Sequence, residues 1–174
     1  MAQQYFVLGI GGTGMRCIES LIHLCAMGMF DDTDIHLLAL DTDKDNGNFA
    51  RLKEVKEAYV KAKGTDASLR TALNETFFSA NINYYEFSPN YEVKSDFMSV
   101  FNYGDTKFNN PEQTAIADLV LTKNVETFNL RHGYRAQTHL GSMMMYHSIL
   151  EAARSNKNSE LKTYLQKLIQ VAQN

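Results

Sequence analysis

The chain has 174 residues, 44% of them hydrophobic and 21% charged, which is typical of one globular domain with a substantial core. The net charge of −3 offers no broad electrostatic footprint for DNA or RNA, so we expect no nucleic-acid partner. No run of about 18 apolar residues occurs, which argues against a membrane span, and the first residues do not resemble a signal peptide. A cytoplasmic location is therefore expected.

The first part of the chain predicts a strand, a helix and a second strand. Tyr5–Ile10 (YFVLGI) and Ile35–Leu40 (IHLLAL) are short continuous apolar runs, typical of buried strands in a parallel sheet. Strand, helix and strand of this length form one right-handed crossover unit. Between the strands, apolar residues recur at three- and four-residue steps and predict an amphipathic helix; they are Ile18, Leu21, Ile22, Cys25 and Met29.

Both cysteines of the chain, Cys17 and Cys25, fall in this helix. Eight residues of helix span about 12 Å, too far for a disulfide or a shared metal. We expect both thiols on the apolar side of the helix, buried and reduced.

The rest of the chain predicts mostly helices. Phe49, Leu52, Val55 and Tyr59 form the expected inner face of the first of them, and Met143-Met144-Met145 is expected to pack in the core. The predicted elements are a helix from about Asn46 to Lys63 that Gly64 ends, a helix over Asp66–Phe78, a strand over Ile82–Phe87, short helices over Val93–Phe101 and Glu112–Leu121, and helices over Gly141–Arg154 and Ser159–Gln173.

A glycine-rich segment, Gly9-Ile10-Gly11-Gly12-Thr13-Gly14, stands between the first strand and the first helix. Glycines let the backbone turn sharply and approach a ligand closely, and the N–H groups at the start of a helix favour phosphate. Glycines also serve tight strand–helix packing. Because both flanks are right, we favour nucleotide binding over packing alone.

The second strand ends in Asp41-Thr42-Asp43. Ligands of parallel sheets bind beyond the carboxyl ends of the strands, which places these acids beside the glycine segment. One of them could hold a ribose hydroxyl or a metal-bound water, and either could instead form an Asx turn. We favour a functional role for Asp41 and a helix cap for Asp45.

A third polar segment, Gly133–Gly141, precedes the methionine-rich helix, and its Arg135 could meet a phosphate or be a surface cation. Taken in order, the three segments resemble the tubulin/FtsZ superfamily of GTP-binding proteins. Such chains carry a GxGGxG-type loop after the first strand, an Asn-Thr-Asp element after the second, and a GxGxxPxxG loop before a later helix. Here Asp41 stands for the asparagine, Arg135 for the second glycine of the last loop and Thr138 for its proline.

The resemblance implies an α/β fold, a Rossmann-like three-layer parallel sheet with helices on both faces. It implies GTP or GDP as ligand, with Mg²⁺ as a possible companion. The implied nucleotide contacts are Gly9, Gly11, Gly12, Thr13, Gly14, Asp41, Asp43, Gly133, Arg135 and Gly141, together with Met15 and Arg16, which stand where the family has the asparagine that helps to read the base.

The family's GGGTG(S/T)G phosphate loop occurs nowhere in the chain. The resemblance therefore implies that residues 1–174 are the amino-terminal part of one nucleotide-binding domain, with a helical elaboration at about 89–132. Partners would be the carboxyl-terminal part of the same protein and, for the full-length protein, further copies of itself. Hydrolysis would need both, and no catalytic residue is assigned.

Three alternatives compete with this interpretation. A Rossmann-type NAD(P) site also uses a glycine loop and an acid after the second strand, although 27 residues separate Gly14 from Asp41 instead of about 20. A ThiF-like ATP-binding domain would use Asp41, Asp43, Asn48 and Arg51. The chain could also be a scaffold module that has lost the nucleotide.

Overall fold

The computed structural model describes residues 3–30, 32–69, 78–89, 138–154 and 159–173. The elements in these ranges are β1 (Gln4–Ile10), α1 (Gly11–Ala26), β2 (Asp34–Leu40), α2 (Asn48–Leu69), β3 (Asn81–Phe87), α6 (Thr138–Arg154) and α7 (Glu160–Ala172). All three predicted strands are present, and the α/β class is confirmed.

The three strands form a parallel sheet in the order β1-β2-β3. Ile10 pairs with Leu40, and Leu40 pairs with Phe87, so the strands end level with one another. The segments that follow the strands therefore leave the sheet at one common edge. This edge is where a parallel sheet binds its ligands.

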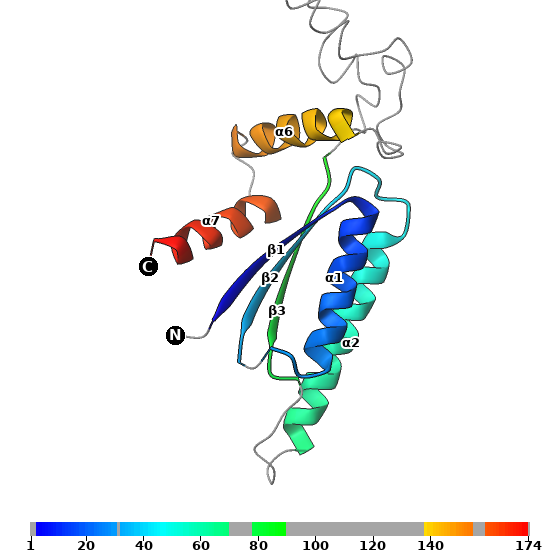
Figure 1. Cartoon of the computed structure of the whole chain (residues 1–174), viewed down its shortest axis with the longest axis vertical. Coiled ribbons are helices and arrows are strands. Elements are labelled where there is room, and N and C mark those ends of the chain that lie inside the picture. Colours follow the sequence, from blue (N-terminus) through cyan, green and yellow to red (C-terminus); the bar gives the residue numbers. More distant parts are fainter. Residues whose placement is uncertain (1–2, 31, 70–77, 90–137, 155–158, 174) are drawn as a thin grey trace, which may run out of the picture.

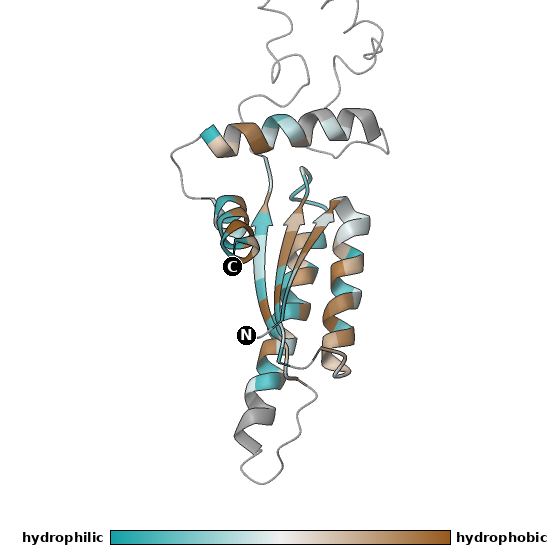
Figure 2. Ribbon diagram, turned by 60° about the vertical axis from the view of Figure 1, so that its left-hand side comes forward, coloured by the Kyte–Doolittle hydropathy of each residue, from teal (hydrophilic) through white to brown (hydrophobic). Residues whose placement is uncertain are grey.

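Helices pack on both faces of the sheet (Figures 1 and 2). Helices α1 and α2 cover one face and α7 the other, while α6 runs across the carboxyl ends of the strands. The core on the α1–α2 side contains Ile18, Ile22, Cys25, Ile35, Leu37, Phe49, Leu52 and Tyr59. The smaller core on the other face contains Leu38, Leu40, Met145, Leu161 and Tyr164.

The two predicted buried strands differ in exposure. Residues 35–40 of β2 are all buried, because this strand lies between two others and has helices on both faces. On β1 the prediction is wrong for Tyr5, Leu8 and Ile10, which are 39%, 49% and 53% exposed. β1 is an edge strand of the described sheet. On the α7 face Phe6 packs against Tyr164, whereas Leu8 and Ile10 join no core cluster of the described residues. Tyr5 lies on the other face, beside Phe30.

The apolar stripe predicted for helix α1 is buried only in part. Ile18, Ile22 and Cys25 are buried as expected. Met29 is not, because α1 ends at Ala26 and Met29 lies beyond it with 61% of its surface exposed. Cys17 is also exposed, contrary to the prediction, because it falls one position outside the buried stripe.

Helix α2 confirms the predicted inner face, with Phe49, Leu52 and Tyr59 buried and Val55 packed against the core. The predicted end at Gly64 is wrong, because the helix continues to Leu69. The Lys63 ammonium donates to the carbonyl oxygens of Ser79 and Ala80, at 2.9 and 3.0 Å, and holds this part of the helix against the segment before β3.

Several other predicted boundaries need correction. Residues 66–69 belong to α2, not to a separate helix, and Phe78 is not helical, while 70–77 lie outside the described residues. The short helices expected at 93–101 and 112–121, and nearly all of the expected elaboration, also lie outside them. The two last helices are confirmed. α6 begins at Thr138, and α7 begins after Ser159, whose hydroxyl accepts a hydrogen bond from Lys162 N.

Within the ranges that the structure describes, no helix has the length and apolar character needed to cross a membrane.

Candidate functional site

The glycine segment turns directly from β1 into α1. Gly11 has a φ of +66°, a conformation that favours glycine, and it is the first residue of the helix. Ile10 occupies the N-cap position and provides no side-chain hydrogen bond. The N–H groups of the first turn therefore have no side-chain cap, and the positive end of the helix dipole is open to an anion.

The glycines of this segment have two different reasons to lack a side chain. A Cβ on Gly14 would lie 2.7 Å from the carbonyl carbon of Gly9, and one on Gly9 would lie 2.8 Å from the Gly14 oxygen. Close packing of strand on helix explains these two. A Cβ on Gly11 would meet nothing within 4 Å, and one on Gly12 would meet the Asn48 amide at 2.9 Å. Gly11 thus faces free space among the described residues, whereas Gly12 faces the Asn48 side chain of α2.

The three other predicted contacts in or just after this segment, Thr13, Met15 and Arg16, point in different directions. Thr13 is exposed in the first turn of α1, next to Gly12. Met15 is only 2% exposed and packs in the core between the sheet and the two helices. Arg16 is exposed and lies one turn further along the helix, where its guanidinium is 3.5 Å from Glu19.

The segment after β2 is held by Asx turns. Asp41 is 5% exposed; its Oδ1 accepts a hydrogen bond from Asp43 N at 3.1 Å, and its Oδ2 accepts one from Asn46 Nδ2 at 3.2 Å. Asp43 in turn accepts from Asp45 N at 3.0 Å through Oδ1. Among the described residues, Asp43 Oδ2 has no hydrogen-bond partner. Asp41 therefore shapes this loop, and Asp43 keeps one carboxylate oxygen without a partner among the described residues.

Asp45 does not cap the following helix, contrary to the prediction. Helix α2 begins at Asn48, after Gly47 with a φ of +75°. The Gly47 carbonyl accepts from Arg51 N at 3.0 Å, which is the first bond of the helix. Asn46 Oδ1 accepts from Asn48 N at 3.0 Å, so Asn46 supplies the side-chain contact expected of Asp45.

Sequence reasoning missed a hydroxyl at this edge. Thr42 is 4% exposed, and its Oγ1 is buried without a hydrogen-bond partner among the residues that the structure describes. The Oγ of Ser88, which follows β3 at the same edge, is in the same condition. A buried hydroxyl without a partner typically costs about 1–3 kcal/mol, so a polar group that reaches Thr42 would be bound favourably. No sequence pattern distinguishes such a hydroxyl from one that is satisfied.

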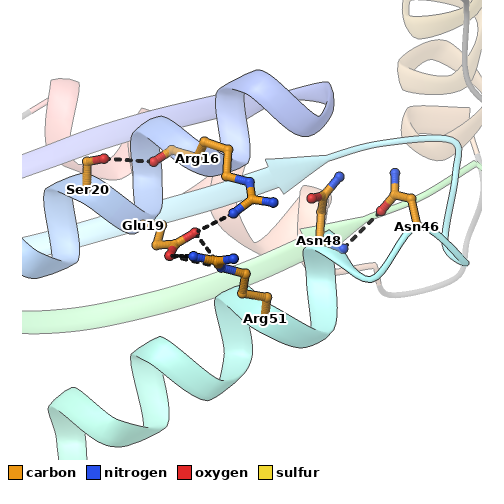
Figure 3. Close-up of polar contacts among 6 residues, drawn as sticks. All are labelled: Arg16, Glu19, Ser20, Asn46, Asn48 and Arg51. Carbon is orange, nitrogen blue, oxygen red and sulfur yellow. Dashed lines mark hydrogen bonds and ion pairs between the residues drawn. The ribbon is translucent and has the colours of Figure 1, made fainter.

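An ion pair between the exposed Arg51 and the buried Glu19 joins α1 to the first turn of α2 (Figure 3). Arg51 donates to both carboxylate oxygens of Glu19 at 2.7–3.0 Å, and Glu19 is 8% exposed. The hydrogen bonds from Arg51 lower the pKa of Glu19, against the opposing effect of burial. This pair keeps Asn48 beside Gly12. A glutamate next to the buried Ile18 of an apolar stripe is the sequence signal that could have revealed it.

The third predicted segment is described only at its end. Gly133, Arg135 and the other residues up to 137 lie outside the described residues. Thr138 to Gly141 form the first turn of α6, so the expectation that the loop extends to Gly141 is wrong. Where the structure describes the chain, no group of three or more His, Cys, Asp or Glu side chains could hold a metal ion by itself.

Comparisons with protein-family models, with curated proteins and with solved structures find no match to this chain.

Proposed function

We propose that this chain binds the phosphates of a guanine nucleotide, GTP or GDP, as the amino-terminal part of a tubulin/FtsZ-like domain. The observation that carries the proposal is the uncapped start of α1 at the carboxyl edge of a parallel sheet. There Gly11 adopts a positive φ, and a Cβ added to it would meet nothing within 4 Å among the described residues. Packing between strand and helix explains Gly9 and Gly14, and the nearby Asn48 side chain of α2 limits the space at Gly12, but no neighbour explains Gly11.

The surrounding groups have the chemistry that a nucleotide needs. The N–H groups of Gly11, Gly12 and Thr13 would donate to phosphate oxygens. The free oxygen of Asp43 would accept from a ribose hydroxyl or from a water on Mg²⁺, an ion that proteins often hold through one or two carboxylates together with substrate phosphates. The unpartnered Thr42 hydroxyl fits a polar ligand at the same edge.

Two contacts weigh against the alternative nucleotides. In an NAD site the acid after the second strand accepts from ribose hydroxyls, but both oxygens of Asp41 already accept bonds from its own loop. In the ThiF-like interpretation Arg51 would meet ATP, but Arg51 is bound to Glu19. We therefore place GTP ahead of ATP and NAD. Two free thiols accord with the cytoplasmic location that we also propose.

The open side of β1 supports a further part of the proposal. Leu8 and Ile10 are exposed and lie outside the core that Phe6 joins on the α7 face, and β1 has no partner on its outer edge in the described sheet. We propose that the carboxyl-terminal part of the same protein adds a strand at this edge. With helices α1 and α2 on one face and α7 on the other, the glycine turn would then lie where the strand order reverses, the usual place for a ligand. Hydrolysis and self-assembly are proposed for the full-length protein only.

The test is calorimetric titration of the 174-residue chain with GTP, ATP and NAD, each with Mg²⁺. We expect GTP to bind most tightly and the variant Gly12→Leu to abolish binding, because the side chain would fill the mouth of the turn. The matched control is Gly64→Leu, since a Cβ on Gly64 meets nothing within 4 Å. Binding of NAD without any response to GTP would overturn the proposal, and so would equal GTP affinity in Gly12→Leu.

A further inference from the structure

A second site lies at the opposite end of the sheet from the glycine turn. It is a pocket of about 590 Å³, within the range of small-molecule sites. Asp34 and Asn81, the first residues of β2 and β3, line it, whereas the glycine turn follows the last residue of β1. Tyr59 of α2 and Tyr85 of β3 add aromatic surface to its wall.

Four side chains in the wall carry polar groups that have no hydrogen-bond partner among the described residues; they are His36, Asn83, Tyr85 and Lys167. They come from β2, β3 and α7. His36 is only 4% exposed, and neither of its ring nitrogens has a partner. Its ring stacks on Phe6 with a centroid distance of 4.6 Å. Burying a polar ring without a hydrogen bond is costly, which is typical of a group that a ligand completes.

The other polar groups of the pocket are already occupied. Lys63 donates to two carbonyl oxygens and to Asn81 Oδ1 at 2.6–3.0 Å. Asp34 accepts from Asn81 Nδ2 at 2.9 Å. With one aspartate against two lysines, the ionised groups of the wall carry a net positive charge, and Lys167 is the cation left for a ligand. An oxygen anion is the partner that an ammonium and an amide N–H bind together.

We propose that this pocket binds a small organic oxyanion, that is, a carboxylate or phosphate attached to an apolar body. Lys167 and Asn83 would bind the anionic oxygens, and the imidazole of His36 forms a buried part of the pocket wall. The apolar body would lie against Tyr85, on the same face of the sheet as His36 and Asn83; Tyr59 belongs to the core on the opposite face. This proposal does not depend on nucleotide binding at the glycine turn, because none of the lining residues belongs to that turn.

The charges around His36 give the site a pH signature. Burial lowers the pKa of His36, the charge of Lys167 lowers it further, and Asp34 acts in the opposite direction. The rings of Phe6 and Tyr85 stack on the His36 ring from β1 and β3. An anion beside Lys167 offsets that positive charge, so binding favours protonation of His36. Affinity should therefore increase as the pH falls below about 6.5.

The test follows the ring signals of His36 by NMR while the 174-residue chain is titrated with phenyl phosphate and with benzoate. We expect a saturable shift with at least one of them, and which one binds identifies the oxyanion. Lys167→Gln and Asn83→Asp should each weaken binding about tenfold or more, because a charge-assisted hydrogen bond is lost or a like charge is added. Lys162→Gln is the control, since Lys162 lies on the same helix but does not line the pocket.

The outcomes separate the proposal from adventitious charge effects. Absence of a saturable shift with both probes overturns it, and so does equal weakening by Lys162→Gln and Lys167→Gln. Inorganic phosphate that binds as tightly as phenyl phosphate also overturns it, because the apolar wall then contributes nothing. Tighter binding at lower pH that disappears in His36→Phe supports it.

Discussion

Gly12 and Gly14 lie in the same turn of α1 but differ in what an added methyl group would meet. A Cβ on Gly14 would lie 2.7 Å from the carbonyl carbon of Gly9 and 2.9 Å from its Cα, and these are backbone atoms. A Cβ on Gly12 would lie 2.9 Å from the Asn48 amide nitrogen, the end of a side chain that can rotate. Alanine at position 14 must therefore push β1 and α1 apart, whereas alanine at position 12 must only displace one amide.

The two substitutions should have different effects on stability. Forcing an extra methyl group into close packing costs about 1–3 kcal/mol, and here the neighbour is backbone that cannot rotate away. The gain from alanine over glycine in a helix, at most about 1 kcal/mol, is common to both positions. We expect Gly14→Ala to destabilise the chain by about 2 kcal/mol and to lower Tm by about 4–8 °C. Gly12→Ala should change the free energy of unfolding by less than about 0.5 kcal/mol.

Thermal unfolding followed by circular dichroism measures the change in stability of each variant. A GTP titration measures the change in nucleotide affinity. Gly12→Ala should weaken nucleotide binding at nearly unchanged Tm, because its methyl group and the displaced Asn48 amide occupy the mouth of the turn. The control is Gly64→Ala, which meets nothing within 4 Å inside α2 and should raise stability by about 0.5–1 kcal/mol. Equal loss of Tm in both loop variants, or none in Gly14→Ala, would refute the assignment of separate packing and binding glycines.

Three further predictions concern ionisable side chains. Burial raises the pKa of the Cys25 thiol to about 11, whereas Cys17 is exposed, so Ellman's reagent should label one thiol rapidly in the native chain and none in Cys17→Ser. Because the pKa of His36 is lowered on folding, the unfolded chain binds more protons below pH 6.5, and stability falls as the pH decreases. In urea unfolding, His36→Phe should remove this loss, which amounts to at most about 1.4 kcal/mol per pH unit for one proton. Arg51 lowers the pKa of Glu19 below 4.5, so this carboxylate stabilises the fold above that pH and loses its effect in acid. Glu19→Gln should lower Tm at neutral pH, and its difference from the wild type should shrink as the pH falls through the pKa of the folded state; a constant difference would contradict this.

The strands and α1 were predictable because their signals are local. Continuous apolar runs and a 3.6-residue stripe follow from burial of strand and helix faces. The same signals could not show which strand is the more deeply buried, because Tyr5–Ile10 and Ile35–Leu40 are both continuous apolar runs. Only the sheet order shows that the second run lies between two strands and that Leu8 and Ile10 remain open.

The end of α2 shows why a strong local signal can fail. Glycine weakens a helix by about 1 kcal/mol, and Gly64 predicts a stop on that ground. Distant contacts outweigh it, because the Tyr59 hydroxyl donates to the Ala80 carbonyl at 2.9 Å and Lys63 donates to the same oxygen at 3.0 Å. These bonds join residues 17–21 positions apart, and no periodicity in the sequence encodes them.

In the candidate site, some features follow from local sequence signals and others depend on contacts that the sequence does not reveal. The positions of the glycines were predictable because a strand, a glycine turn and a helix form one local unit. The roles of the acids were not, because Asp41 is the more deeply placed carboxylate and uses both oxygens to hold its own loop. That arrangement leaves Asp43 with the free oxygen and Thr42 with the unpartnered hydroxyl, beside a helix start that has no cap. These groups are the ones on which we base the proposal of a ligand at this edge of the sheet.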